Sequence, residues 1–176
     1  MSEQQQQRLI VGVDKFENIV ALLLEEAGFW VRRGFKVALT QDEKRQIGKT
    51  SAPKPEIDML AYHPGRQELL VLEVKAYQDT PGVKLAQMQE VHEVPTGRFK
   101  LFTSDLYRQV VFTRLQQQLL ELGQIAEQTR LRLGLIPGKV NQGQSEALRA
   151  LMQERDWFFW SPDEVKAKVA ARSAQG

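Results

Sequence analysis

The sequence predicts a mixed α/β domain whose central sheet contains an antiparallel hairpin. Residues 56–62 and 68–77 are apolar, strand-like segments joined by the short turn sequence HPGRQ, which is the pattern of a hairpin. Residues 14–27 and 104–128 instead place their apolar side chains at helical spacing. Helices and strands that alternate along a chain of 176 residues favour one layered α/β domain.

The first part of the chain is expected to supply one helix and one strand before the hairpin. Residues 1–13 are polar and Gln-rich, so we expect a flexible tail, followed by a single domain over residues 14–172. The helix should begin at Asp14. A strand is expected over residues 29–40, with a kink or bulge at Gly34.

Two polar segments, residues 41–55 and residues 78–102, are expected to be loops, the second with some local structure. Ser104 is the expected N-cap of the long helix that follows. The remaining elements are a strand over 129–140, a helix over 143–155, a short strand over 156–160 and a last helix capped by Ser161. The expected order of elements is therefore αβββαβαβα.

The composition excludes several classes of protein. Hydrophobic residues make up 42% of the chain and charged residues 26%, which is ordinary for a globular domain with a substantial core. No apolar run approaches the roughly 18 residues of a spanning helix, and the polar N-terminus lacks a secretory signal. Cysteine is absent, which excludes a disulfide scaffold, a thiolate zinc site and a cysteine nucleophile. We therefore expect a cytoplasmic protein with no membrane segment.

The charged residues limit the chemistry that the chain can perform. The formal net charge of +2 neither requires nor excludes a polyanionic partner, so a nucleic-acid site would have to come from local patches. The chain has only two histidines, and a metal site would consequently rely on carboxylates. Carboxylate oxygens favour Mg²⁺ or Mn²⁺ over Zn²⁺.

Asp58, Glu73 and Lys75 are the residues that say most about function. Glu73 and Lys75 lie two positions apart in a strand that is otherwise apolar on both sides, so they share a face. A turn centred between Gly65 and Arg66 sets Asp58 directly opposite Glu73. Charges in such a strand are costly unless they are paired or bound to a metal. Two adjacent carboxylates repel each other unless they share a cation, so this pair could hold a divalent metal.

An alternative explanation of the same register is an internal ion pair. The register that pairs Asp58 with Glu73 also sets Glu56 opposite Lys75, so these two side chains could neutralise each other. Asp58 would then only mark the start of a strand. A register slip of one residue would place the two carboxylates on opposite faces of the sheet.

The pattern P-E-I-D, followed by E-V-K in the next strand, resembles the PD-(D/E)XK nuclease superfamily, which includes restriction endonucleases and Holliday-junction resolvases. By this resemblance Asp58 matches the first acid, Glu73 the second acid and Lys75 the lysine. The resemblance implies a restriction endonuclease-like core. Pro55 stands three positions before Asp58 instead of next to it, which leaves Glu56 as a competitor for the role of first acid.

The resemblance implies a metal-dependent nuclease that hydrolyses phosphodiester bonds of DNA, acting as an endonuclease. Asp58, Glu73 and the backbone carbonyl of Val74 would hold Mg²⁺ or Mn²⁺, and Lys75 would stabilise charge in the transition state. In many such enzymes a glutamate on the first helix completes the metal site, and Glu17 is the candidate here. Its D-x-x-E spacing also suits a capping box. The alternative function is a catalytically inactive nucleic-acid-binding or assembly subunit on the same fold.

Basic and polar residues near these acids are candidates for contacts with DNA. Four of them lie in the segment that leads into Asp58, and a glutamine lies one turn into the long helix. They are Lys44, Arg45, Lys49, Lys54 and Gln109. Basic side chains would neutralise phosphates in a salt-dependent manner. DNA is the expected partner, while a second copy of the chain and an accessory protein are partners that the sequence leaves open.

Overall fold

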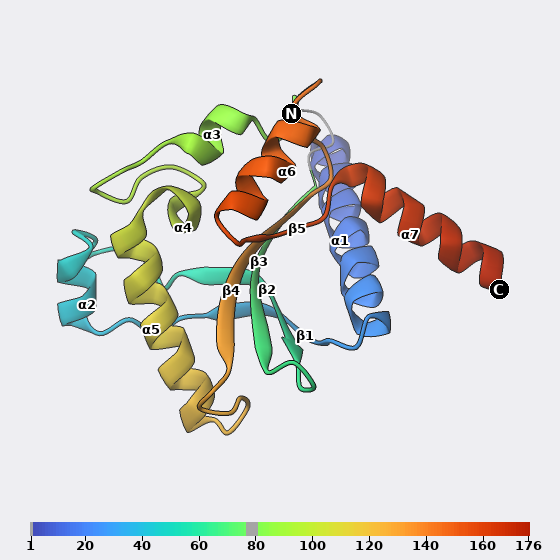
Figure 1. The fold of residues 1–176 in the computed structure, drawn as a ribbon. Coiled ribbons are helices and arrows are strands. Elements are labelled where there is room, and N and C mark those ends of the chain that lie inside the picture. The colour runs from blue at the N-terminus through green and yellow to red at the C-terminus, as the bar shows by residue number, and fades with distance from the viewer. Residues whose placement is uncertain (1, 77–80) are drawn as a thin grey trace.

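A mixed five-stranded sheet forms the centre of the molecule (Figure 1). The computed structural model describes residues 2–76 and 81–176, and in residues 8–14 it describes the helical backbone alone. The strands are β1 (Trp30–Lys36), β2 (Glu56–His63), β3 (Glu68–Lys75), β4 (Arg130–Pro137) and β5 (Phe158–Phe159). They follow one another across the sheet in chain order. β1, β2 and β3 are antiparallel neighbours, whereas β3, β4 and β5 run parallel.

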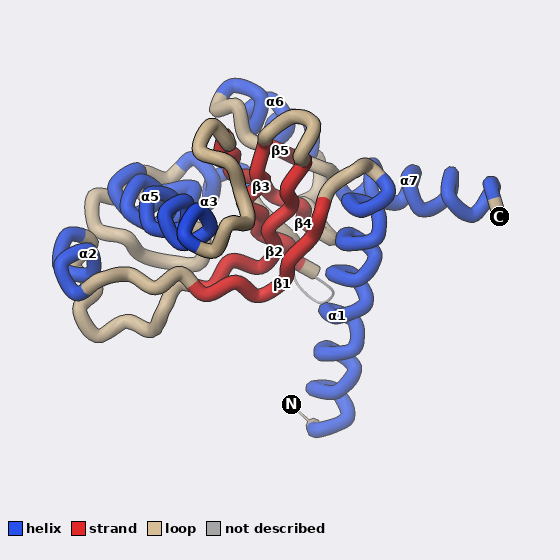
Figure 2. Tube along the Cα trace, turned by 90° about the horizontal axis from the view of Figure 1, so that it is seen from below, coloured by secondary structure: helices blue, strands red, loops and turns tan. Residues whose placement is uncertain are grey.

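Helices cover both faces of this sheet. They are α1 (Glu3–Glu26), α2 (Gln41–Gln46), α3 (Leu85–Gln89), α4 (Lys100–Thr103), α5 (Asp105–Glu121), α6 (Ser145–Glu154) and α7 (Pro162–Gln175). In Figure 2, α1 and α5 lie on opposite sides of the sheet, and the first turns of α1 and the end of α7 extend beyond it. The prediction of a mixed α/β domain with an antiparallel hairpin is confirmed.

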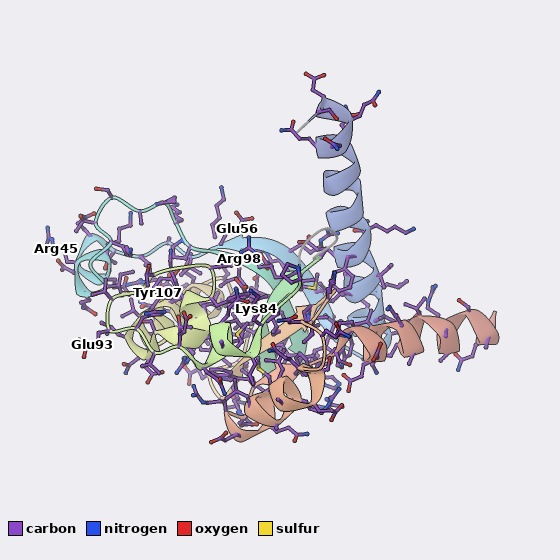
Figure 3. All side chains as sticks on the ribbon, turned by 90° about the horizontal axis from the view of Figure 1, so that it is seen from above. Arg45, Glu56, Lys84, Glu93, Arg98 and Tyr107 are labelled. Carbon is purple, nitrogen blue, oxygen red and sulfur yellow. The ribbon has the colours of Figure 1, made fainter. Side chains whose placement is uncertain are left out.

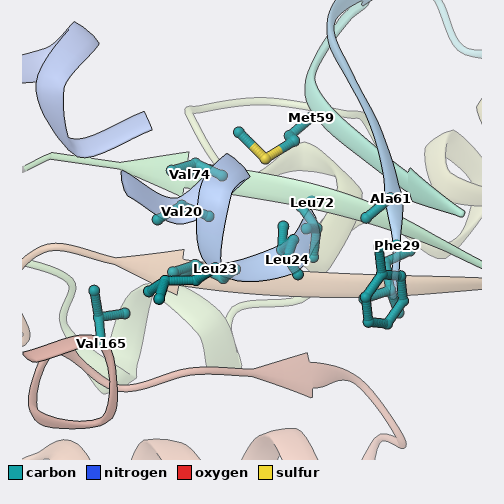
Figure 4. Packing of buried hydrophobic residues seen from close by; sticks show 11 residues of the cluster. Val20, Leu23, Leu24, Phe29, Met59, Ala61, Leu72, Val74 and Val165 are labelled. Carbon is teal, nitrogen blue, oxygen red and sulfur yellow. The ribbon is translucent and has the colours of Figure 1, made fainter. Parts of the chain in front are cut away.

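Apolar side chains alternate along the strands, and a helix packs against them on each face of the sheet. On one face, Leu23 and Leu24 of α1 pack with Leu72 and Val74 of β3 (Figure 4). On the other face, β2 and β3 pack against α5 through Leu60, Leu69, Val71, Val111, Leu115 and Leu119. Because both faces of β3 are covered, its even-numbered and odd-numbered side chains enter different cores. Glu73 and Lys75 therefore belong to the face that α5 covers.

The strand β1 changes the direction of its side chains at Gly34, which has a φ of 68°. Val31 packs against the α1 face, while Phe35 packs against the α5 face although it lies an even number of residues away. The pairing with β2 keeps one register on both sides of Gly34, from Arg33↔Met59 to Phe35↔Ile57. No residue is inserted, so the expected irregularity is a kink and not a bulge.

Two predictions about the first helix and the first loop were wrong. α1 begins at Glu3, where Ser2 and Gln5 form a capping box, so the Gln-rich segment expected as a tail lies within the helix and the expected start at Asp14 is too late. The segment 41–55 contains α2, because Thr40 and Glu43 form a second capping box in a stretch that was expected to be a loop.

The second half of the chain follows the expected pattern with shorter elements. α5 is capped by Ser104 as expected but ends at Glu121, because Gly123 has a φ of 67° and closes the helix. The segment expected as a long loop contains the short helices α3 and α4, and Tyr77, the expected end of the second hairpin strand, lies outside the described residues. The observed order αβαββαααβαβα thus contains three short helices that were not predicted. None of the helices in the described ranges has both the length and the apolar character that crossing a membrane requires.

Candidate functional site

The hairpin between β2 and β3 has the register that was predicted from the turn. Its pairs run from Met59↔Leu72 to His63↔Glu68, and the same register, continued by one residue, sets Asp58 opposite Glu73. Both carboxylates consequently lie at the point where the paired part of the hairpin ends. β4 runs along the other edge of β3 and continues its pairing through Lys75.

Lys75 brings the two acids together. Its Nζ atom lies 3.7 Å from Oδ2 of Asp58 and 3.9 Å from Oε2 of Glu73. The ion pairs of Lys75 therefore go to Asp58 and Glu73, and not to Glu56 as the alternative explanation required. Glu56 is exposed and lies opposite Lys36 of β1.

Backbone groups of Val74 complete this cluster. The backbone N–H of Val74 donates a hydrogen bond of 3.0 Å to Oδ2 of Asp58. In a strand, the N–H and C=O of one residue point toward the same neighbour. The carbonyl of Val74 therefore faces the β2 side, where Asp58 lies. We call Asp58, Glu73, Val74 and Lys75 the acidic cluster from here on.

Glu73 is the most perturbed group of the acidic cluster. Burial raises the pKa of its carboxyl to about 7, and the charge of Asp58 adds to this effect, while Lys75 and Arg98 oppose it. Its Oε2 atom is buried and has no hydrogen-bond partner among the described residues. An unsatisfied carboxylate oxygen in this position costs free energy unless a ligand reaches it.

The donor atoms of the acidic cluster suit a hard divalent cation. Two carboxylates and one backbone carbonyl are oxygen ligands of the kind that Mg²⁺ and Mn²⁺ bind. In the described part of the chain, no group of three or more His, Cys, Asp or Glu side chains is placed to hold a metal. A cation bound here would therefore keep waters in its coordination shell, as Mg²⁺ commonly does.

A cavity of about 240 Å³ opens beside Glu73. Basic side chains from two separate segments reach it: Lys44, Lys49, Lys54, Arg98 and Lys100. The acids in its lining are Glu56 and Glu73. Five cations against two carboxylates give this cavity a positive balance that the net charge of the chain does not reveal. We call it the basic cavity.

The structure separates the residues that were predicted to contact DNA. Lys44, Lys49 and Lys54 line the basic cavity. Arg45 does not line it, because its guanidinium turns to Asp42, at 2.7 Å, and lies at the outer edge of α2 (Figure 3). Gln109 is exposed on α5 and is also absent from the lining.

Glu17 lies away from the acidic cluster. It lies in the middle of α1, which packs against the opposite face of the sheet, and its Oε2 atom pairs with Nη2 of Arg33 at 3.0 Å. The alternative role as a capping residue is also wrong, because α1 begins at Glu3. The ion pair with β1 is the interaction that the structure gives this side chain.

Tyr107 is a residue of this region that the sequence analysis missed. It lines the basic cavity, and Figure 3 shows it in the same part of the molecule as Arg98. Burial raises the pKa of its phenol, and the charge of Glu73 raises it further, so the hydroxyl stays protonated. The ammonium of Lys100 lies 5.9 Å from the centre of its ring. Its spacing of four residues from the buried Val111 was the signal that placed it on the inner face of α5.

Comparisons with known proteins add little to this site. No family model matches the chain, and no curated protein matches it. One solved structure, titled "Crystal Structure of Protein of Unknown Function AF1548", aligns with a TM-score of 0.46 and 16% sequence identity. The alignment covers 82% of this chain and 55% of that chain, so the present chain spans about half the length of its neighbour.

Proposed function

We propose that this chain is a nuclease with a restriction endonuclease-like core, which uses Mg²⁺ or Mn²⁺ to hydrolyse phosphodiester bonds within DNA. The observation that carries the proposal is the placement of Lys75 within 4 Å of both Asp58 and Glu73, where Glu73 has an unsatisfied buried oxygen. A buried carboxylate oxygen without a hydrogen bond is a place where a cation or a water can bind.

In this proposal Asp58, Glu73 and the carbonyl of Val74 hold the metal. When bound, the cation supplies positive charge that polarises a phosphoryl oxygen and lowers the pKa of water. The hydrogen bond from the Val74 N–H fixes the carboxylate of Asp58, so that this group is oriented before a ligand arrives. Such preorganisation reduces the cost of binding.

Lys75 contributes positive charge at the reacting phosphate. Its ammonium is anchored between two carboxylates on a buried strand, so little conformational freedom is left to lose. A fixed cation of this kind stabilises the charge that develops on the phosphate oxygens in the transition state. The basic cavity beside Glu73 binds further phosphates of the strand, in a salt-dependent manner.

The metal site is tested by binding and cleavage in parallel. We expect Mg²⁺ or Mn²⁺ to raise the melting temperature of the native chain, and EDTA to abolish cleavage of supercoiled and linear DNA. Asp58→Asn should show neither the rise in melting temperature with metal nor the cleavage of DNA. Arg45→Ala, which removes a charge outside the cavity, should show both. Metal binding without cleavage of any DNA would favour the non-catalytic binding subunit. Cleavage of RNA alone would overturn the assignment of DNA as substrate.

The role of Lys75 is tested by truncation to alanine. We expect Lys75→Ala to keep the fold and the affinity for DNA but to lose about thirty- to a thousandfold in the rate of cleavage, equivalent to about 2–4 kcal/mol. The rate should be measured well above pH 7, where the carboxyl of Glu73 is ionised. Unfolding of the variant would indicate a structural ion pair, and full activity would show that Lys75 has no part in catalysis.

A further inference from the structure

The walls of the basic cavity come from parts of the chain that are distant in sequence. One wall is the segment of α2 and the residues after it, which contributes Lys44, Lys49 and Lys54. A second segment contributes Arg98 and Lys100, which precede α5. Glu56 and Arg98, which Figure 3 labels, both line the cavity although they are more than forty residues apart in the sequence. The cavity therefore gathers positive charge from two segments that are distant in sequence.

The lining also contains apolar residues. Its large aliphatic members are Leu39, Ile47, Ile57, Leu101 and Val111, and Tyr107 is its aromatic member. A nucleotide has the same division, with a flat apolar base and an anionic phosphate. Sites that bind single-stranded nucleic acids combine a positively charged groove with aromatic rings on which bases stack. The lining therefore matches a nucleotide better than it matches a simple anion.

The size of the cavity limits what can enter. A cavity of about 240 Å³ is at the small end of the range of ligand sites, which commonly measure about 300–1,000 Å³. A base inside a duplex cannot enter a pocket of this kind while it stays paired and stacked. An unpaired base, from a single strand, a frayed end or a flipped nucleotide, can do so.

We infer that the basic cavity is a subsite for one unpaired nucleotide of the DNA strand, next to the phosphate that is cleaved, so that single-stranded or frayed DNA is the preferred substrate. This inference rests on the proposed nuclease function, because Glu73 belongs both to the cavity and to the acidic cluster. Tyr107 provides the stacking surface. Lys49 and Lys54 provide charge for the phosphate, since neither forms an ion pair with a carboxylate in the residues that the structure describes.

The inference is tested by binding in EDTA, so that cleavage does not interfere. Fluorescence anisotropy would compare a labelled single strand with the blunt duplex of the same sequence, at one salt concentration. We expect the native chain to bind the single strand at least about tenfold more tightly. Equal binding, or tighter binding of the duplex, would overturn the subsite.

Variants in the lining identify the cavity as the origin of this preference. Tyr107→Ala should weaken binding of the single strand about five- to a hundredfold, the range expected for loss of one stacked base, and should leave binding of the duplex nearly unchanged. Tyr107→Phe keeps the ring and should bind like the native chain, which shows that the ring and not the hydroxyl is required, while unchanged duplex binding by Tyr107→Ala excludes a defect in folding. Lys49→Ala should weaken single-strand binding, whereas the matched charge removal Arg45→Ala should not. If Lys49→Ala and Arg45→Ala changed single-strand binding to the same extent, the strand would not bind in the basic cavity.

Failure of this inference differs from failure of the proposed nuclease function. Metal-dependent cleavage of blunt duplex and single strand at equal rates would overturn the subsite and leave the nuclease intact. Preferential binding of the single strand, with no metal-dependent cleavage of any substrate, would overturn the nuclease and leave a site for unpaired nucleotides.

Discussion

Glu73 shows how much of a site can be predicted at the scale of one residue. Its position opposite Asp58 follows from counting across the turn, and the register of the hairpin confirms that count. The burial of its Oε2 atom could not be predicted in this way, because it depends on α5 and on the segment around Arg98. Local alternation determines which face a side chain occupies, whereas its solvation depends on distant parts of the chain.

The raised pKa of Glu73 predicts a particular dependence of stability on pH. Since the folded pKa is about 7 and the reference value is 4.5, the folded state binds the extra proton between these values. The associated stability is complete below pH 4.5 and is lost as the pH rises to about 7, a change of about 3 kcal/mol. In urea unfolding with EDTA, Glu73→Gln should lose this part of the pH dependence and become more stable than the native chain above pH 7.

A matched control for this experiment lies on the neighbouring strand. Glu56 lines the same cavity but is exposed, so Glu56→Gln should keep the pH dependence of the native chain. If the free energy of unfolding changed with pH in the same way for the native chain and for Glu73→Gln, the pKa of Glu73 would not be raised.

At the scale of elements, α2 shows why short helices escape a search for apolar periodicity. The helix has six residues, and none of them is buried, so no apolar stripe marks it. The capping box of Thr40 and Glu43 was present in the sequence as T-x-x-E and was the signal that could have predicted it. Long helices such as α5 carry enough apolar positions to be recognised.

Glu43 also connects α2 to α5 through an ion pair with Arg114. The contribution of this ion pair to stability can be measured. The carboxylate of Glu43 accepts hydrogen bonds from Nε of Arg114 at 2.8 and 3.2 Å, and both side chains are largely shielded from solvent. Glu43→Gln keeps a side chain that can complete the capping box but removes the charge. We expect the free energy of unfolding to fall by about 1–3 kcal/mol, measured by urea unfolding near neutral pH.

Two further variants isolate the contribution of this ion pair. Asp42→Asn removes the exposed pair with Arg45 on the same helix and should cost no more than about 0.5 kcal/mol. In a double-mutant cycle of Glu43→Gln and Arg114→Met, the loss of unfolding free energy in the double variant should be smaller than the sum of the losses in the two single variants. Full additivity would show that the contact between Glu43 and Arg114 contributes nothing measurable.

At the scale of the whole molecule, the gathering of basic residues in one cavity is the property that is hardest to predict from the sequence. A net charge of +2 gives no reason to expect a cavity lined by five basic residues. Three of the five, Lys44, Lys49 and Lys54, were named as candidates because they lie in the segment that leads into β2. The sequence could not separate them from Arg45, since only the folded position of α2 decides which side chains turn inward.

This distribution predicts how binding of single-stranded DNA depends on salt. Each phosphate neutralised on a single strand contributes about −0.7 to the slope of log K against log salt, so five basic residues allow a slope no steeper than about −3.5. We expect Lys49→Ala to make the slope about 0.7 less steep, while Arg45→Ala leaves it unchanged. The measurement is anisotropy titration at several salt concentrations in EDTA. A slope far steeper than this limit would require phosphate contacts outside the basic cavity, and a slope near zero would mean that its lysines do not face the strand.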